Sequence, residues 1–143
     1  MLRSILNRST QIAISAMGHM AEIHADPNRK LSLTEIAESR ELQAPFLGKI
    51  LVALSRSGLV EGWRGPGGGY RLGREPAQIQ LKEIADLFER QDTLYVCPYG
   101  KNYCGTDVKC PLHSQIEFLN ETMNTFLDTT TLASFAESKK PQK

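Results

Sequence analysis

The chain has 143 residues, of which 41% are hydrophobic and 23% charged, and its formal net charge is +1. This length suits one compact domain, or a small domain with a dimerising extension. No apolar run is long enough to cross a bilayer, and the N-terminus lacks the apolar core and cleavage site of a secretory signal. We therefore expect a cytoplasmic protein without a membrane function.

The small net charge conceals an asymmetry along the chain. Residues 1–74 carry ten Lys and Arg against six Asp and Glu, a net charge of +4, whereas residues 75–143 carry seven against ten, a net charge of −3. The basic part is the candidate for contact with phosphates. The three cysteines are an odd number in a chain without an export signal. A disulfide framework is therefore a poor explanation, and metal or redox chemistry is favoured.

Two helices open the basic part. Apolar residues recur at helical spacing over residues 9–24, and the sequence Asp-Pro-Asn then ends that helix. Ser32 and Glu35 have the spacing of a capping box, in which each side chain binds a free backbone amide of the other residue. This pair predicts a short second helix over residues 33–40.

A third helix follows, with one face directed to the core and one face open. Pro45 lies in its first turn, where the missing N–H costs nothing, and Gly58 ends it. The open face carries small or basic side chains, among them Ala53. The stripe that we expect to be buried comprises Leu47, Ile50, Leu51 and Leu54.

After this helix the hydrophobic period changes from 3.6 towards 2. Segments 59–64 and 70–74 are short strand candidates around the sequence GPGGG, which predicts a β-hairpin with a glycine-rich tip. Two short helices joined by a tight turn and followed by a basic hairpin outline a winged helix-turn-helix, a motif whose second helix enters the major groove of DNA. The predicted fold class is therefore mainly α with a small β-hairpin wing.

The candidate DNA contacts lie on the third helix and the hairpin. Side chains in the first turns of a recognition helix face base edges, whereas basic side chains around it hold phosphates. We expect base contacts from Gln43, Pro45, Phe46 and Lys49. We expect backbone contacts from Arg56, Arg64, Arg71 and Arg74, with Gly67 and Gly68 at the wing tip. The alternative is a small helical fold that touches no nucleic acid and whose arginines form a solvated face.

The rest of the chain is expected to hold a helix over 81–89, a cysteine loop over 91–111 and a long helix after Pro111. We divide the chain into a DNA-binding domain, residues 1–75, and a segment for cluster binding and dimerisation, residues 76–143. The long helix carries an apolar seam that could pack against the body or against a second copy. This seam comprises Leu112, Ile116, Leu119, Met123 and Phe126.

The cysteine loop holds every cysteine of the chain, in the spacing C-x6-C-x5-C, with a histidine three residues after the last. Soft thiolates select zinc, copper or iron–sulfur clusters. Structural zinc sites usually contain a close cysteine pair, which is missing here, and the wider spacing lets three thiolates wrap a bulkier cluster. A metal-free thiol switch is the alternative, because a cysteine beside a lysine can be reactive. The candidate ligands are Cys97, Cys104, Cys110 and His113.

Several stretches carry a resemblance to a known family: LSLTEIAE, FLGKILVALSRSGLV, RGPGGGYRLGR and IQLKEIADLFE, followed by the three cysteines. Over nearly its whole length, the chain resembles the Rrf-two family of winged-helix transcription regulators, in particular its IscR- and NsrR-like members. The resemblance implies a homodimer held by the long C-terminal helix. It also implies a palindromic operator of double-stranded DNA and an iron–sulfur cluster that sets the affinity for it.

The resemblance also implies which residues hold the cluster. The three cysteines would be ligands, and in the IscR branch the residue three positions after the last cysteine, here His113, completes a two-iron cluster. In some other members an acidic residue in the first helix of the partner subunit is a ligand, and the matching position here is Gln11, a poor ligand. A 2Fe–2S cluster is therefore favoured over a 4Fe–4S cluster.

The predicted function is a DNA-binding transcriptional regulator whose operator affinity is controlled by an iron–sulfur cluster in the loop over 97–110. A cluster-free thiol-redox regulator and a small iron–sulfur electron carrier are the alternatives. No nucleophile–base pair or paired carboxylates stand out from ordinary surface residues. We therefore expect neither catalysis nor a small-molecule substrate.

Overall fold

The computed structural model describes residues 6–89 and 111–138. Its elements are α1 (Arg8–Ile23), α2 (Leu33–Ser39), α3 (Ala44–Ser57), β1 (Val60–Trp63), β2 (Gly69–Leu72), the 3-10 helix η2 (Pro76–Gln78), α4 (Leu81–Phe88), α5 (His113–Thr129) and α6 (Ala133–Ser138). Helices with one two-stranded sheet confirm the predicted fold class. Within the described ranges, no helix is long and apolar enough to cross a membrane.

The first three helices begin and end where local sequence signals predict. At α2, Ser32 Oγ accepts a hydrogen bond from the Glu35 amide (3.1 Å), and Glu35 Oε2 accepts one from the Ser32 amide (2.8 Å), so the predicted capping box is confirmed. Helix α3 has Pro45 in its first turn and ends at Gly58, whose φ of 83° is left-handed. A residue without a Cβ adopts that conformation readily, which explains why the helix stops there.

The hairpin is tied to the connection between α1 and α2. Strands β1 and β2 are antiparallel, and their register pairs Val60 with Leu72 at one end and Trp63 with Gly69 at the other. On the other edge of β2, Leu31 and Tyr70 exchange two backbone hydrogen bonds of 2.9 and 2.7 Å. Leu31 thus ties the chain between α1 and α2 to the free edge of β2 and holds the wing against the body.

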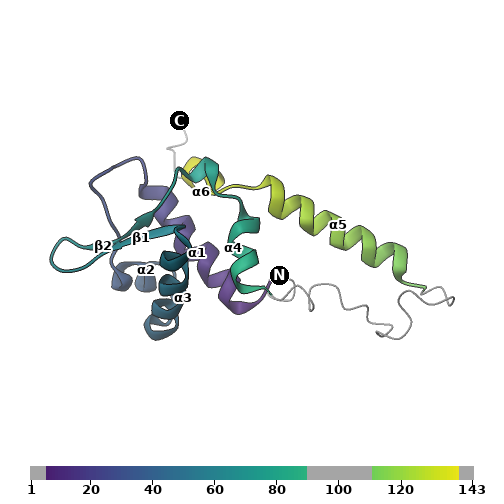
Figure 1. Ribbon diagram of the computed structural model, residues 1–143, viewed down its shortest axis with the longest axis horizontal. Helices are drawn as coiled ribbons and strands as arrows, with labels where there is room; N and C mark the ends of the chain where they lie inside the picture. Colours follow the sequence, from purple (N-terminus) through teal and green to yellow (C-terminus); the bar gives the residue numbers. More distant parts are fainter. Residues whose placement is uncertain (1–5, 90–110, 139–143) are drawn as a thin grey trace.

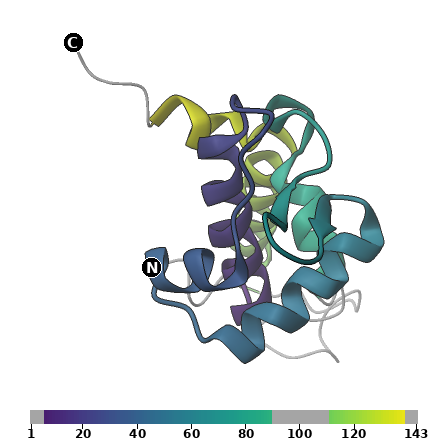
Figure 2. The same ribbon diagram turned by 90° about the vertical axis from the view of Figure 1, so that its left-hand side faces the viewer.

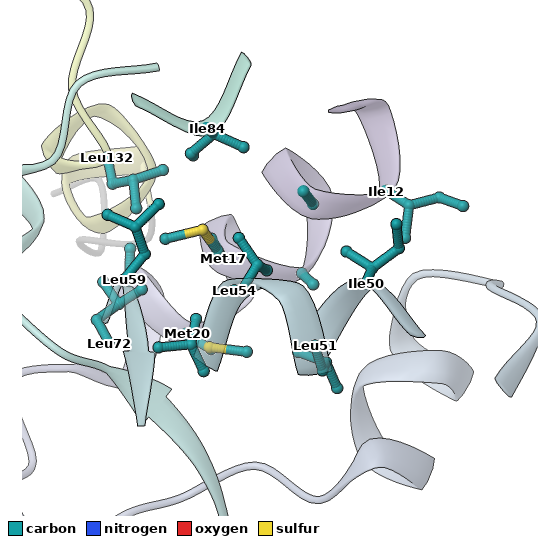
Figure 3. Packing of buried hydrophobic residues seen from close by; sticks show 14 of the residues in the cluster. Ile12, Met17, Met20, Ile50, Leu51, Leu54, Leu59, Leu72, Ile84 and Leu132 are labelled. Atoms are coloured by element: carbon teal, nitrogen blue, oxygen red, sulfur yellow. The ribbon is translucent and has the colours of Figure 1, made fainter. Parts of the chain in front are cut away.

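The core lies between α1, α3, the hairpin and α4. Figure 3 shows side chains of α1, among them Met17 and Met20, directed towards Leu54 of α3 and Leu72 of β2. The predicted α3 stripe is buried as expected, with Leu47, Ile50, Leu51 and Leu54 each exposed by 4% or less. Burying one such side chain contributes about 1.5–3 kcal/mol, so this shared face holds α3 firmly on α1.

Residues after position 75 contribute to the same core. Ile84 of α4 and Leu132, which follows α5, are each fully buried in the cluster around α1. Leu127, near the end of α5, is buried as well. The division of the chain at residue 75 stays a prediction, and the described part of the second segment packs on the first.

The winged helix and α5 occupy opposite ends of the molecule. In Figure 1, α2, α3 and the hairpin lie at one end, and α5 extends away from the body at the other. Figure 2 views the first end face on, with α3 running along its lower part and the hairpin on the right. A ligand bound across α3 and the hairpin would therefore leave α5 uncovered.

Candidate functional site

The open face of α3 carries the predicted base contacts. Gln43, Pro45, Phe46 and Lys49 are all exposed, whereas the opposite stripe of α3 is buried. Among the described residues, the Gln43 side chain makes no capping hydrogen bond to α3, although its backbone begins the helix. Residues 44–57 contain no acidic side chain. This face thus offers polar, apolar and cationic groups together, without the negative charge that would repel phosphates.

Of the four arginines predicted to contact phosphates, two make hydrogen bonds within the fold and the other two are exposed. Arg56 in the last turn of α3 and Arg64 directly after β1 are exposed. At the wing tip, Gly67 has a φ of 78°, and the Gly68 amide donates a 2.9 Å hydrogen bond to the Gly65 carbonyl. This tight turn needs glycine at position 67. DNA contact by these four positions stays a prediction.

Arg71 already has partners inside the fold. Its Nη1 donates hydrogen bonds to the carbonyls of Asp26 (2.9 Å) and Arg29 (3.0 Å), and its Nη2 donates one to the carbonyl of His24 (3.1 Å). The guanidinium therefore clamps the chain after α1 onto β2. Its predicted phosphate contact stays a prediction, and the structure adds a role within the fold.

Arg74 is engaged in a similar way. Its Nη2 lies 2.5 Å from Glu83 Oε1, and its Nη1 donates a 3.3 Å hydrogen bond to the Gln78 carbonyl. The ion pair connects the segment after β2 to α4 and neutralises part of the arginine's charge. The DNA contact predicted for Arg74 is likewise untested.

An aromatic residue of the wing belongs to the exposed surface but is absent from the predicted contacts. Trp63, at the end of β1, is 40% exposed, and Lys30 Nζ lies 4.5 Å from the centre of its ring. A cation above a tryptophan face is attracted by the ring's electrons. A tryptophan next to the glycine-rich tip is the sequence signal that could have identified this pair.

The three predicted cysteine ligands lie outside the described residues, and the fourth candidate lies inside them. His113 is the first residue of α5; its side chain is exposed, and its Nε2 lies 3.6 Å from Glu117 Oε2. In the described ranges alone, no group of three or more His, Cys, Asp and Glu residues is placed to hold a metal ion. The Gln11 side chain donates a 2.6 Å hydrogen bond from Nε2 to the Leu6 carbonyl, so it binds the backbone.

The donor set fits an iron–sulfur cluster by its chemistry. Cysteine thiolates are the usual ligands of such clusters, and imidazole replaces thiolate in some two-iron centres. Among the described residues, the His113 side chain is 61% exposed at the start of α5, so it is accessible to a ligand there. Sequence reasoning missed Glu117, although a carboxylate four residues along a helix is a common partner for a histidine.

Most of the predicted seam of α5 is open to solvent. Leu112 is 40% exposed and Leu119 60% exposed, and the neighbouring Phe118, which was not predicted, is 67% exposed. Phe126 is also exposed, whereas Ile116 and Met123 are half-buried. Contact of this seam with a second copy stays a prediction.

Comparisons with known proteins agree with this architecture. The model of the Rrf2 family, described as an iron-dependent transcriptional regulator, matches residues 6–138. The HTH-type transcriptional regulator IscR of Cereibacter sphaeroides is 36% identical over 84 residues, which cover 59% of this chain and 52% of that protein.

Two solved structures share the fold. IscR of T. potens has a TM-score of 0.72 at 24% identity and covers 96% of this chain and 93% of its own. CymR of B. subtilis, the global cysteine regulator, has a TM-score of 0.73 at 24% identity, with coverage of 94% and 98%. Because the family model matches nearly the whole described chain, the predicted membership is confirmed: this chain belongs to the Rrf2, or Rrf-two, family of transcriptional regulators.

Proposed function

We propose that this Rrf2-family regulator binds a palindromic operator of double-stranded DNA as a homodimer, and that an iron–sulfur cluster in the loop over 97–110 controls its operator affinity. The observation that carries DNA binding is the exposed, acid-free face of α3 beside a glycine-tipped wing. An α-helix fits the major groove, and the cationic side chains Lys49, Arg56 and Arg64 surround this face.

The ligands of the proposed cluster are Cys97, Cys104, Cys110 and His113. When bound, a 2Fe–2S cluster would supply a group whose charge changes with oxidation state and which cross-links the loop. His113 connects the loop directly to α5, because it is the first residue of that helix. A change in the loop can therefore alter how α5 begins, and α5 is the proposed contact between the two copies.

The coupling between the cluster and DNA is reciprocal. If the form with cluster binds the operator more tightly than the form without it, the operator must increase cluster retention by the same factor. Two half-sites of a palindrome lie about 34 Å apart, or a multiple of this distance, so a small rotation between the copies spoils the register of the recognition helices.

The cluster is tested on protein purified anaerobically. Iron and sulfide analysis, with visible and resonance Raman spectra, is expected to reveal a two-iron cluster, and His113→Ala is expected to change the spectrum or lose the cluster. Gln115→Ala, at an exposed position in the same first turn of α5, is the matched control and should keep the spectrum. Iron-free, colourless protein with full operator affinity would overturn the cluster proposal. Peroxide-sensitive DNA binding by iron-free protein would establish the thiol-redox alternative.

DNA binding is tested separately. The chain should select specific duplexes from a random-sequence pool, and the affinity should fall with salt because binding releases counterions. Lys49→Gln should weaken this binding, whereas Lys82→Gln, on the outer face of α4, should not. A protein that carries the cluster but selects no duplex would contradict the regulator proposal and favour the electron carrier.

A further inference from the structure

We propose that α3 recognises A·T pairs through thymine methyl groups, with Phe46 and Val52 as apolar contacts on either side of Lys49. This inference rests on the proposed function and deepens it, because it states which bases the exposed face of α3 reads. It also adds Val52 to the predicted DNA contacts.

Four exposed residues form one row along α3. Gln43, Phe46, Lys49 and Val52 follow each other at intervals of three residues, and all four are exposed. Three residues of an α-helix rise about 4.5 Å and fall 60° short of a full turn, so the row runs obliquely along the open surface. Phe46 and Val52 are therefore turned by about 60° to either side of Lys49, which lies away from the buried stripe, whereas Gln43 is the N-cap directly before the helix.

Two members of this row are large apolar side chains that are exposed. Phe46 is 37% exposed and Val52 is 49% exposed, and both stand among the few large apolar side chains that the described chain leaves uncovered. Valine is also a weaker helix former than alanine or leucine, because its branched Cβ restricts its rotamers. Neither helix propensity nor core packing therefore explains a valine at position 52.

The chemistry of the row matches a particular surface of DNA. The thymine C5-methyl is the apolar group that the base pairs present in the major groove, and apolar side chains contact it. Lysine binds the two acceptors of guanine, and glutamine binds adenine in a bidentate manner. Cytosine is recognised by acidic side chains, and residues 44–57 contain none.

The order of the row predicts the order of the bases. In zinc-finger helices, residues spaced by three or four positions contact successive base pairs. On α3 the sequence Phe46, Lys49, Val52 is apolar, cationic, apolar. We therefore expect each half-site to contain a guanine-bearing pair with an A·T pair on both sides, each with its methyl group towards α3.

Charge argues for DNA as the occupant of this face rather than a protein partner. Lys49 lies between the two apolar side chains, and Arg56 follows one turn after Val52. Two cations beside two apolar groups suit a surface that combines phosphates with methyl groups. An acidic protein partner is the competing occupant, and the experiment below separates the two.

The experiment removes single methyl groups from the DNA. The full chain first selects its operator from random duplexes, and each thymine of a half-site is then replaced by deoxyuridine, which lacks only the methyl. We expect affinity to fall about fourfold at two positions per half-site, the value for losing one buried methyl-sized group. In Phe46→Ala one of these effects should vanish, and in Val52→Ala the other should vanish.

The controls separate this inference from the proposed function. Leu87→Ala, which alters a 42% exposed apolar side chain on α4, should leave both uracil effects intact. A specific operator with no uracil effect, or with effects that both variants retain, would overturn the inference and leave the proposed function standing. No selected duplex at all would overturn both. Circular dichroism of each variant verifies that it is folded.

Discussion

At the scale of single residues, the turn between α2 and α3 is the most constrained point of the helix-turn-helix. Glu41 is the only described non-glycine residue with positive φ, at 53°. Directly after it, the Leu42 amide donates a 2.8 Å hydrogen bond to the Ala37 carbonyl, which closes the turn. The left-handed conformation costs a residue with a Cβ about 1–2 kcal/mol, so the backbone at Glu41 is mildly strained.

Replacing Glu41 by glycine should relieve that strain. We expect Glu41→Gly to leave the free energy of unfolding unchanged or to raise it by up to about 1 kcal/mol, because the entropy cost of glycine offsets part of the gain. Glu41→Val should lower it by about 1 kcal/mol or more. Urea unfolding measures both. The control Glu38→Gly, inside α2, should lose about 1 kcal/mol, and an equal loss in Glu41→Gly would contradict the strain.

Arg64, directly after β1, and Arg71, within β2, should behave differently. Arg71→Lys replaces a fork that binds three backbone carbonyls by a single ammonium group, so we expect the free energy of unfolding to fall by about 1–2 kcal/mol. Arg64→Gln, on an exposed position, should leave stability unchanged and lower the salt slope of operator binding by about 2, because each copy of the dimer loses one phosphate contact. Equal unfolding midpoints for Arg71→Lys and the unaltered chain would contradict the clamp.

At the scale of elements, local patterns predicted the helices and the hairpin because each pattern reports contacts within a few residues. The capping box at Ser32 and the apolar stripe of α3 are examples, and the open face of α3 follows directly from that buried stripe. The internal roles of Arg71 and Arg74 could not be predicted in this way. Their partners come from α1, its following loop and α4, which only the tertiary fold brings near.

The contact between α1 and α6 is a second feature without a local signal. A Cβ built at Gly18 would lie 2.7 Å from the Phe135 ring, so α6 packs directly on the backbone of α1. The two residues lie far apart in the sequence, and nothing in the charged C-terminal segment indicates the pairing. The glycine in the middle of α1 is explained by this close approach rather than by helix formation.

Because of this contact, the effect of Gly18→Ala on the free energy of unfolding should change sign when Phe135 is removed. Gly18→Ala should lower the free energy of unfolding by about 1–3 kcal/mol, because the new methyl group overpacks against Phe135. In a Phe135→Ala background the same change should raise it by up to about 1 kcal/mol, since alanine is the better helix former and the obstacle is gone. Thermal or urea unfolding of the four proteins measures this cycle. Equal effects of Gly18→Ala in both backgrounds would contradict the contact.

At the scale of the whole molecule, the arrangement separates two surfaces. The acid-free face of α3 and the wing lie at one end, and the exposed apolar seam of α5 begins at the other (Figure 1). Phe118 and Leu119 expose more than half of their surface, which is costly for a solvated monomer and typical of an interface. A dimer through α5 would bury them and direct two α3 helices outwards to separate half-sites.

The α5 seam therefore predicts the oligomeric state. A chain of 15.9 kDa should sediment as a species of twice that mass, and Leu119→Glu should raise the dimer dissociation constant by about 100-fold or more. The reason is that each copy would bury an unpaired carboxylate in an apolar contact.

Glu121→Lys, on the other side of the same helix, should leave the dimer intact. Far-UV circular dichroism should stay unchanged in Leu119→Glu, because Leu127 and not Leu119 joins α5 to the core. Operator affinity should then fall as the dimer dissociates, since a monomer contacts only one half-site. A Leu119→Glu protein that remains dimeric would place the interface elsewhere.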